Sequence, residues 1–277
     1  MFKEHVRKNY RECCSKEDYF NIRRDFQAYK KEKPEEWKKE FEALIFKPNP
    51  FAKIILGTSR EKYTNFGKLI LTQDKFNLNH YLLIPNDLKY FNALTLQKED
   101  VPLLLEMSRL VNKYMSKDEN DEYMLFFHCY PYNSIHTLHL HVIKKEFYSA
   151  RKNDLMLEDV LYILENENML ILGYDNKEKV DDILDEWFSS ESLTMLNIYI
   201  AALILIEQSQ VLTNKSEYIP IALNLVLDYL FNKQMISDKQ YILDYIEQDK
   251  HTLSSLTDVL FSLCKKSHLL QKQIKNY

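Results

Sequence analysis

Glycine is scarce in this chain, with three residues among 277. Loops that cradle phosphates through backbone N–H groups depend on glycine, and neither a P-loop nor a dinucleotide-binding fingerprint occurs here. Long hydrophobic runs are also lacking, since the longest, at 196–206, is too short to span a bilayer and predicts a buried helix. The first residues carry no apolar stretch typical of a signal peptide. We therefore expect a cytoplasmic protein without a membrane partner.

Cysteine and excess positive charge are sparse as well. The chain has four cysteines, no CxxC spacing, and two cysteines that are sequence neighbours, so we expect them to stay reduced. The net charge is −4 and the pI is about 6.1. Without a global basic field, a nucleic-acid partner would need a local basic patch. The hydrophobic content of 45% is enough for a sizeable buried core.

The chain divides by pattern into three parts. Residues 1–47 are charged and aromatic and predict two helices that break near Pro34. The prolines at 48 and 50 disfavour helix and mark a boundary. Short apolar segments between polar turn residues then predict strands, whereas apolar residues at three- and four-residue spacing predict one long helix. The predicted strands are 51–55, 68–72, 80–84 and 123–128, and the predicted helix is 101–115.

From residue 153 onward the apolar spacing is helical. The predicted helices are 157–165, 180–188, 193–208, 218–231, 238–248 and 253–270. The sequence thus predicts an α+β fold, in which an antiparallel sheet with a long helix at 48–152 is followed by an all-helical C-terminal domain at 153–277.

Four of the eight histidines lie within residues 128–141. Polar and apolar residues alternate there, which predicts a strand over 135–143 with Thr137, His139 and His141 on one face. Two imidazoles one strand repeat apart suit either metal binding or phosphate chemistry. A third interpretation is a half-exposed strand on which both histidines have only structural roles.

A zinc site built on His139 and His141 would need a third ligand. His80 and Cys129 are the candidates. The remaining histidines of the run, His128 and His136, are assigned structural or packing roles. An alternative is that His136 swings in to join the other two.

Residues 127–143 resemble the signature of the histidine-triad (HIT) superfamily, His-φ-His-φ-His-φ-φ, where φ is apolar. The preceding Phe-His-x-x-Pro-Tyr is most similar to the Hint and aprataxin branch, with a weaker likeness to scavenger decapping enzymes. Residues 50–55 resemble the strand that lines the purine pocket, and 79–85 resemble the family's His-x-Leu-Val-Ile-Pro segment. The resemblance covers about 49–150 and implies an HIT-like nucleotide-binding domain.

The resemblance implies a role for each matched residue. The family nucleophile falls on His139, the third histidine of the triad on His141, and the supporting upstream histidine on His80. Thr137 stands in place of the first histidine, and Thr72 in place of the acidic residue that holds the ribose. The residues expected to bind the nucleotide are Phe51, Ile54, Thr72, Asn133, Ser134 and Thr137. Lys144, Lys145 and Arg151 could meet a polyanionic substrate.

The implied activity is hydrolysis or transfer of a purine nucleotide or nucleotidyl conjugate through a nucleotidyl-histidine intermediate on His139, with no metal or cofactor. Thr137 cannot carry a proton at neutral pH, and loss of general-acid help costs about 10²–10⁴-fold. The alternative is therefore a catalytically weakened HIT-fold module that binds a nucleotide or a protein, with the helical domain mediating interactions. The resemblance also leaves a homodimer open.

Overall fold

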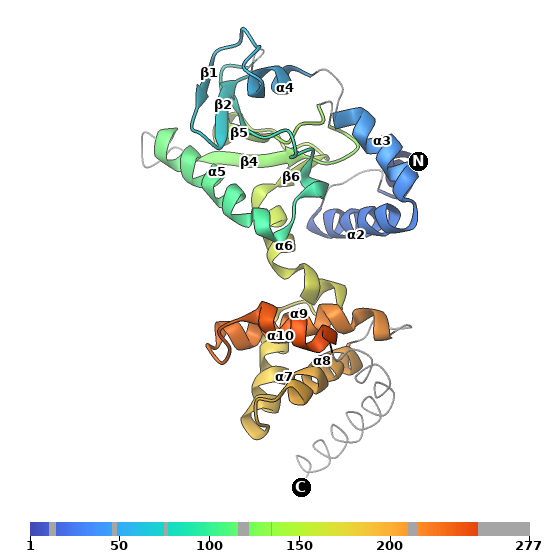
Figure 1. Ribbon diagram of the computed structural model, residues 1–277. Coiled ribbons are helices and arrows are strands. Elements are labelled where there is room, and N and C mark those ends of the chain that lie inside the picture. Colours follow the sequence, from blue (N-terminus) through green and yellow to red (C-terminus); the bar gives the residue numbers. More distant parts are fainter. Residues whose placement is uncertain are drawn as a thin grey trace. The chain divides into compact units, whose positions relative to one another are not determined.

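The computed structural model describes residues 1–10, 15–45, 49–74, 77–115, 122–133, 135–209 and 215–248 (Figure 1). Its contacts divide the chain into two compact units, Met1–Glu165 and Asn166–Tyr277. The strands are β1 (Tyr63–Asn65), β2 (Leu69–Gln73), β3 (His80–Pro85), β4 (Tyr123–His128), β5 (Leu140–Lys144) and β6 (Asp154–Met156). The α-helices are α1 (Phe2–Asn9), α2 (Lys16–Glu32), α3 (Pro34–Ile45), α4 (Pro50–Ile55), α5 (Val101–Tyr114), α6 (Leu157–Ile171), α7 (Lys177–Ser190), α8 (Met195–Gln208), α9 (Ile219–Asn232) and α10 (Lys239–Gln248).

The first unit is built on one six-stranded sheet in the order β1-β2-β3-β5-β4-β6, and every neighbouring pair is antiparallel. The long helix α5 lies along one face of this sheet (Figure 1). It buries an apolar stripe at three- and four-residue spacing: Val101, Leu104, Met107, Leu110 and Val111. The predicted α+β class is confirmed. The short strands β1 and β6 were not predicted.

The N-terminal helices share the core of the first unit. The predicted break is confirmed, since α2 ends at Glu32 and α3 begins with Pro34. The buried guanidinium of Arg23, on α2, donates hydrogen bonds to the carbonyl oxygens of Leu94 (3.3 Å) and Leu96 (2.6 Å). These bonds satisfy backbone acceptors of a loop and tie α2 to the unit.

Residues 51–55 were predicted as a strand, and this prediction was wrong. They form α4, whose N-terminus is capped by the Asn49 side chain, which accepts a 2.8 Å bond from the N–H of Ala52. Pro50 occupies the first turn, where its missing N–H costs nothing. Phe51 and Ile54 are buried one helical turn apart and pack with apolar residues of β2 and β3. Capping therefore outweighs the strand preference of a short apolar run.

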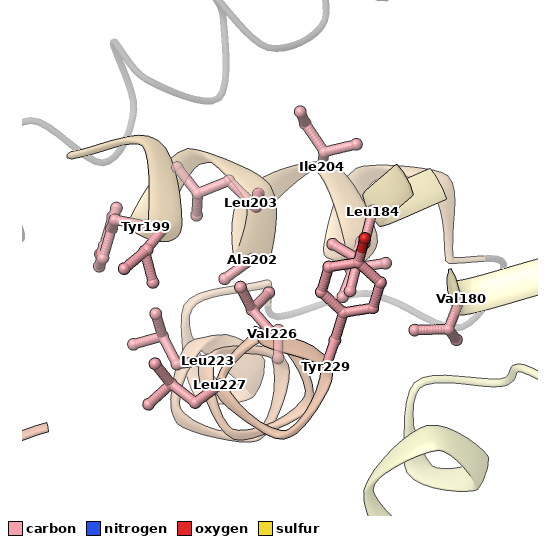
Figure 2. Packing of buried hydrophobic residues seen from close by; sticks show 14 of the residues in the cluster. Val180, Leu184, Tyr199, Ala202, Leu203, Ile204, Leu223, Val226, Leu227 and Tyr229 are labelled. Atoms are coloured by element: carbon pink, nitrogen blue, oxygen red, sulfur yellow. The ribbon is translucent and has the colours of Figure 1, made fainter. Parts of the chain in front are cut away.

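The second unit is helical, as predicted. Most of its core comes from α7, α8 and α9, and α6 and α10 add further buried residues. Figure 2 shows side chains such as Leu184, Ala202 and Val226 from the first three helices. The helix α8 is buried nearly all round, with eight buried residues in fourteen. The helix predicted at 253–270 lies outside the described residues. Among the residues that are described, no helix is long and apolar enough to cross a bilayer.

Two features of the structure differ from the sequence predictions. Cys129 is disulfide-bonded, which contradicts the expectation that the cysteines stay reduced. The strand predicted at 135–143 begins only at Leu140, so Thr137 and His139 precede β5.

We keep the predicted domain boundaries, at 47/48 and 152/153, as a proposal beside the contact boundary at Glu165.

Candidate functional site

A cavity of about 640 Å³ opens within the first unit and holds the histidine cluster. Four histidines line it: His80, His128, His139 and His141. Its apolar wall comes from α4 and the sheet, and its rim carries residues from the segment that follows β5. The cavity is large enough for a nucleotide-sized ligand.

Strand register explains why these side chains meet. Leu82 of β3 lies opposite His141 of β5, which in turn lies opposite Phe126 of β4. Side chains two residues apart share a face of the sheet, so His80 and His128 point to the same side as this row. All five side chains accordingly line the cavity.

His139 is buried, and its orientation is fixed by one hydrogen bond. Its Nδ1 lies 2.7 Å from the carbonyl oxygen of Thr137. A carbonyl can only accept, so Nδ1 carries the proton and Nε2 keeps its lone pair. Burial lowers the pKa of His139 to about 4, against the opposing effect of the Thr137 carbonyl. The ring is therefore neutral at pH 7, and Phe51 packs edge-on against it with ring centroids 4.8 Å apart.

His141 belongs to a chain of polar contacts that runs to the cavity rim. Its Nδ1 lies 2.8 Å from Nε2 of His80, and Nδ1 of His80 lies 3.6 Å from the Asp74 carboxylate. Burial, and then the neighbouring His139, lower the pKa of His141. Burial also lowers the pKa of His80, against the attraction of Asp74. The Nε2 atom of His141 is buried and has no hydrogen-bond partner among the described residues.

His128 completes the cluster, although the sequence assigned it a structural role. Its ring centroid lies 4.1 Å from that of His141. Register places it opposite Asp154 of β6, and its Nε2 lies 3.5 Å from the carboxylate of that residue. Burial lowers the pKa of His128, and Asp154 opposes this effect. The sequence did not predict that His128 joins the cluster, because strand β6, which places Asp154 beside it, was not predicted.

The cavity wall carries more negative than positive charge. The carboxylates of Glu61, Asp74 and Asp154 line it, together with the guanidinium of Arg151. Neither of the lysines at 144 and 145 lines the cavity; Lys145 forms an ion pair with Glu122. An anionic ligand would therefore depend on Arg151 and on N–H donors.

The predicted nucleotide-binding residues divide into two groups. Phe51, Ile54 and Thr72 line the cavity. Asn133 is buried and donates to the carbonyl oxygen of Ile135, 3.1 Å away, so its side chain serves the loop. Ser134 lies outside the described residues.

Thr137 does not line the cavity. Its buried hydroxyl donates a 3.2 Å bond to Oδ1 of Asn49, the cap of α4. His136 also stays apart from the cluster: its ring stacks on Phe91 with centroids 5.4 Å apart, and its Nδ1 faces Asn133. The packing role that the sequence assigned to His136 fits this position.

Comparison with known proteins gives one family match, over residues 51–156, to the model described as "Scavenger mRNA decapping enzyme C-term binding". The matched segment spans β1 to β6 and every histidine of the cluster. It supports the histidine-triad superfamily for this part of the chain. It does not single out the Hint and aprataxin branch.

Two solved structures are similar in part. A HIT family hydrolase from Clostridium thermocellum is 19% identical, and the alignment covers 36% of this chain and 93% of that one with a TM-score of 0.31. A Hit-like protein involved in cell-cycle regulation from Bartonella henselae is 19% identical, with coverage of 42% and 95% and a TM-score of 0.28. No curated protein matches the sequence.

Proposed function

We propose that this chain is an HIT-type nucleotide hydrolase or nucleotidyl transferase in which His139 is the nucleophile. The observation that carries the proposal is the 2.7 Å bond between Nδ1 of His139 and the carbonyl of Thr137. It leaves a neutral ring with a nucleophilic Nε2 beside an apolar wall that suits a base. The family match over 51–156 supports the same reading.

The chemistry proceeds in two displacements. Nε2 of His139 attacks the α-phosphorus, an N–P bond forms, and the P–O or P–N bond to the leaving group breaks with its electron pair. The ring then carries a positive charge with its proton still on Nδ1, and the Thr137 carbonyl stabilises that proton. The oxygen of water or of an acceptor attacks the phosphorus next, the N–P bond breaks with its electron pair returning to Nε2, and His139 leaves as a neutral ring. The proton that the attacking group loses passes to the departed leaving group or to solvent.

His141 and Arg151 are proposed to bind the phosphate oxygens. A phosphate needs an N–H at Nε2 of His141. This atom would take up a proton from solvent while the Nδ1 proton of His141 passes to Nε2 of His80 and the Nδ1 proton of His80 passes to Asp74. Arg151 provides the positive charge at the rim. Phe51 and Ile54 would contact the base, and Thr72 the sugar. Asn133 and Ser134 stay proposals as phosphate contacts.

Thr137 restricts the substrates. Its hydroxyl is bonded to Asn49 and cannot protonate a leaving group at neutral pH. We infer that substrates with a good leaving group, such as a nucleotide phosphate, react readily. Substrates with a poor leaving group should react about 10²–10⁴-fold more slowly. We further propose that the chain belongs to the Hint and aprataxin-like branch, that it prefers a purine base and that it forms a homodimer. Nucleic acid that carries an adenylyl group is one substrate to test.

Turnover of a substrate panel tests the proposal. The panel comprises dinucleoside polyphosphates, adenylylated amines, adenylylated nucleic acid and cap analogues, each with wild-type protein and with His139→Ala. His136→Ala is the matched control, since it removes a neighbouring ring outside the cavity. Turnover that persists in His139→Ala, or no turnover of any member, would reject the enzymatic proposal.

One observation favours a second candidate, a nucleotide-binding module without turnover. The position of the first triad histidine is occupied by a threonine whose hydroxyl is engaged in the fold. Calorimetric titration with AMP and GMP separates the two. Binding of either nucleotide together with an inactive panel supports the module, whereas turnover of any panel member rejects it.

A further inference from the structure

The inner nitrogens of the histidine cluster converge on one point. His128, His139 and His141 each offer one ring nitrogen, and these three atoms lie within 4.8 Å of one another. We propose that they form a binding site for a divalent transition-metal ion, with Zn²⁺ as the preferred occupant. The metal site itself does not depend on the proposed nucleotide chemistry.

The outer nitrogens of His139 and His141 already have the partners that metal-binding histidines require. Ligating histidines donate their second ring N–H to a carbonyl or carboxylate, which fixes the tautomer. His139 makes this bond to the Thr137 carbonyl at 2.7 Å. His141 makes it through His80 at 2.8 Å, and Asp74, 3.6 Å from His80 Nδ1, favours a proton on that nitrogen. His80 Nε2 then accepts from His141 Nδ1, so Nε2 of His141 presents a lone pair.

Two buried side-chain atoms at the site lack a hydrogen-bond partner among the described residues. Nε2 of His141, a residue that is 5% exposed, has no hydrogen-bond partner among the described residues. The same holds for Oδ1 of Asp154, whose side chain is 2% exposed and lies 3.5 Å from His128. A metal ion at the point where the three nitrogens converge would give Nε2 of His141 the partner that it lacks, and Asp154 lies where it can accept a hydrogen bond from His128.

Charge and geometry suit a small cation. Three carboxylates and one guanidinium line the cavity around neutral histidines, so a dication improves the local balance. Tetrahedral zinc with Zn–N distances of 2.0–2.1 Å places its ligand nitrogens roughly 3.3 Å apart, and ring rotation can close the remaining gap. Three histidines leave the fourth position open to water from the cavity.

A bound metal ion would occupy the same nitrogen that attacks phosphorus. This consequence rests on the proposed function: Zn²⁺ on Nε2 of His139 and nucleotidyl transfer exclude each other. The ion would therefore act as a reversible inhibitor of the site.

The test is titration of chelator-treated full-length protein with Zn²⁺ alone, followed by calorimetry, and with Co²⁺, followed by visible absorption. We expect one tight Zn²⁺ site and intense Co²⁺ bands typical of tetrahedral nitrogen ligation. His128→Asn should weaken Zn²⁺ binding by at least about 100-fold, and Asp154→Asn by about 10–100-fold. His136→Asn, outside the cluster, should bind like wild type. Circular dichroism checks that each variant is folded.

Absence of stoichiometric Zn²⁺ binding, or equal binding by wild type and His128→Asn, would overturn the metal site. If His128→Asn does not fold, the Co²⁺ spectrum of the wild type decides, because weak octahedral bands contradict the site. An inactive substrate panel beside a normal metal titration rejects the proposed function and leaves the metal site standing.

Discussion

Thr137 donates its side-chain hydrogen bond to Asn49, and so this threonine holds a helix cap instead of facing the cavity. Asn49 caps α4, and α4 carries Phe51 against the ring of His139. Thr137 thus connects the backbone that orients His139 with the helix that covers it. Its contribution is to stability and positioning rather than to proton transfer.

Thr137→Val should lower the free energy of unfolding by about 1 kcal/mol, because it leaves Asn49 without one donor while it keeps the side-chain volume. Urea denaturation measures the change. Thr137→Ser retains the hydroxyl and deletes a buried methyl group, so its loss of about 0.8 kcal/mol measures the packing contribution separately. Equal stability of Thr137→Val and wild type would show that the bond does not support α4.

Arg151→Ala should raise KM for nucleotide substrates about tenfold, because charge-assisted hydrogen bonds contribute about 1.5–3 kcal/mol and this side chain is exposed to screening. The effect should shrink as salt is added. Lys145→Ala is the control, since Lys145 is paired with Glu122 and lies outside the cavity wall. An equal rise in KM for both variants would indicate general loss of positive charge instead of a specific contact.

Acid should destabilise the metal-free protein through the histidine cluster. The pKa of His139 is lowered from 6.5 to about 4 by burial, so between these values the unfolded state binds the proton first. The free energy of unfolding therefore falls as pH drops from about 6.5 towards 4. Urea denaturation with a chelator present measures this slope, which His139→Asn should reduce. A slope unchanged by His139→Asn contradicts the assignment.

Sequence patterns predicted the elements whose periodicity is complete. Strand β4 matches its predicted range of 123–128, and α5 lies within the predicted helix 101–115. The pattern predicted α4 wrongly, because a run of six residues is equally compatible with a strand. The cap at Asn49 and the proline at position 50 favour the helix instead.

The candidate site was predictable where it lies on one strand or follows a motif. His80, His139 and His141 do meet in one cavity. His128 and the contact between Thr137 and Asn49 depend on pairings across 26 and 88 residues, which no local pattern encodes. Asn133 was expected at the ligand, but its amide is used by the loop.

The histidine at the centre of this account can be examined directly. Wild-type protein is mixed with a reactive substrate from the panel, quenched in the first turnover, digested and analysed by mass spectrometry. We expect a nucleotide monophosphate on His139 in the wild type, the same adduct in His136→Ala, and none in His139→Ala. Turnover without any adduct on His139, or an adduct on another residue, would contradict the account.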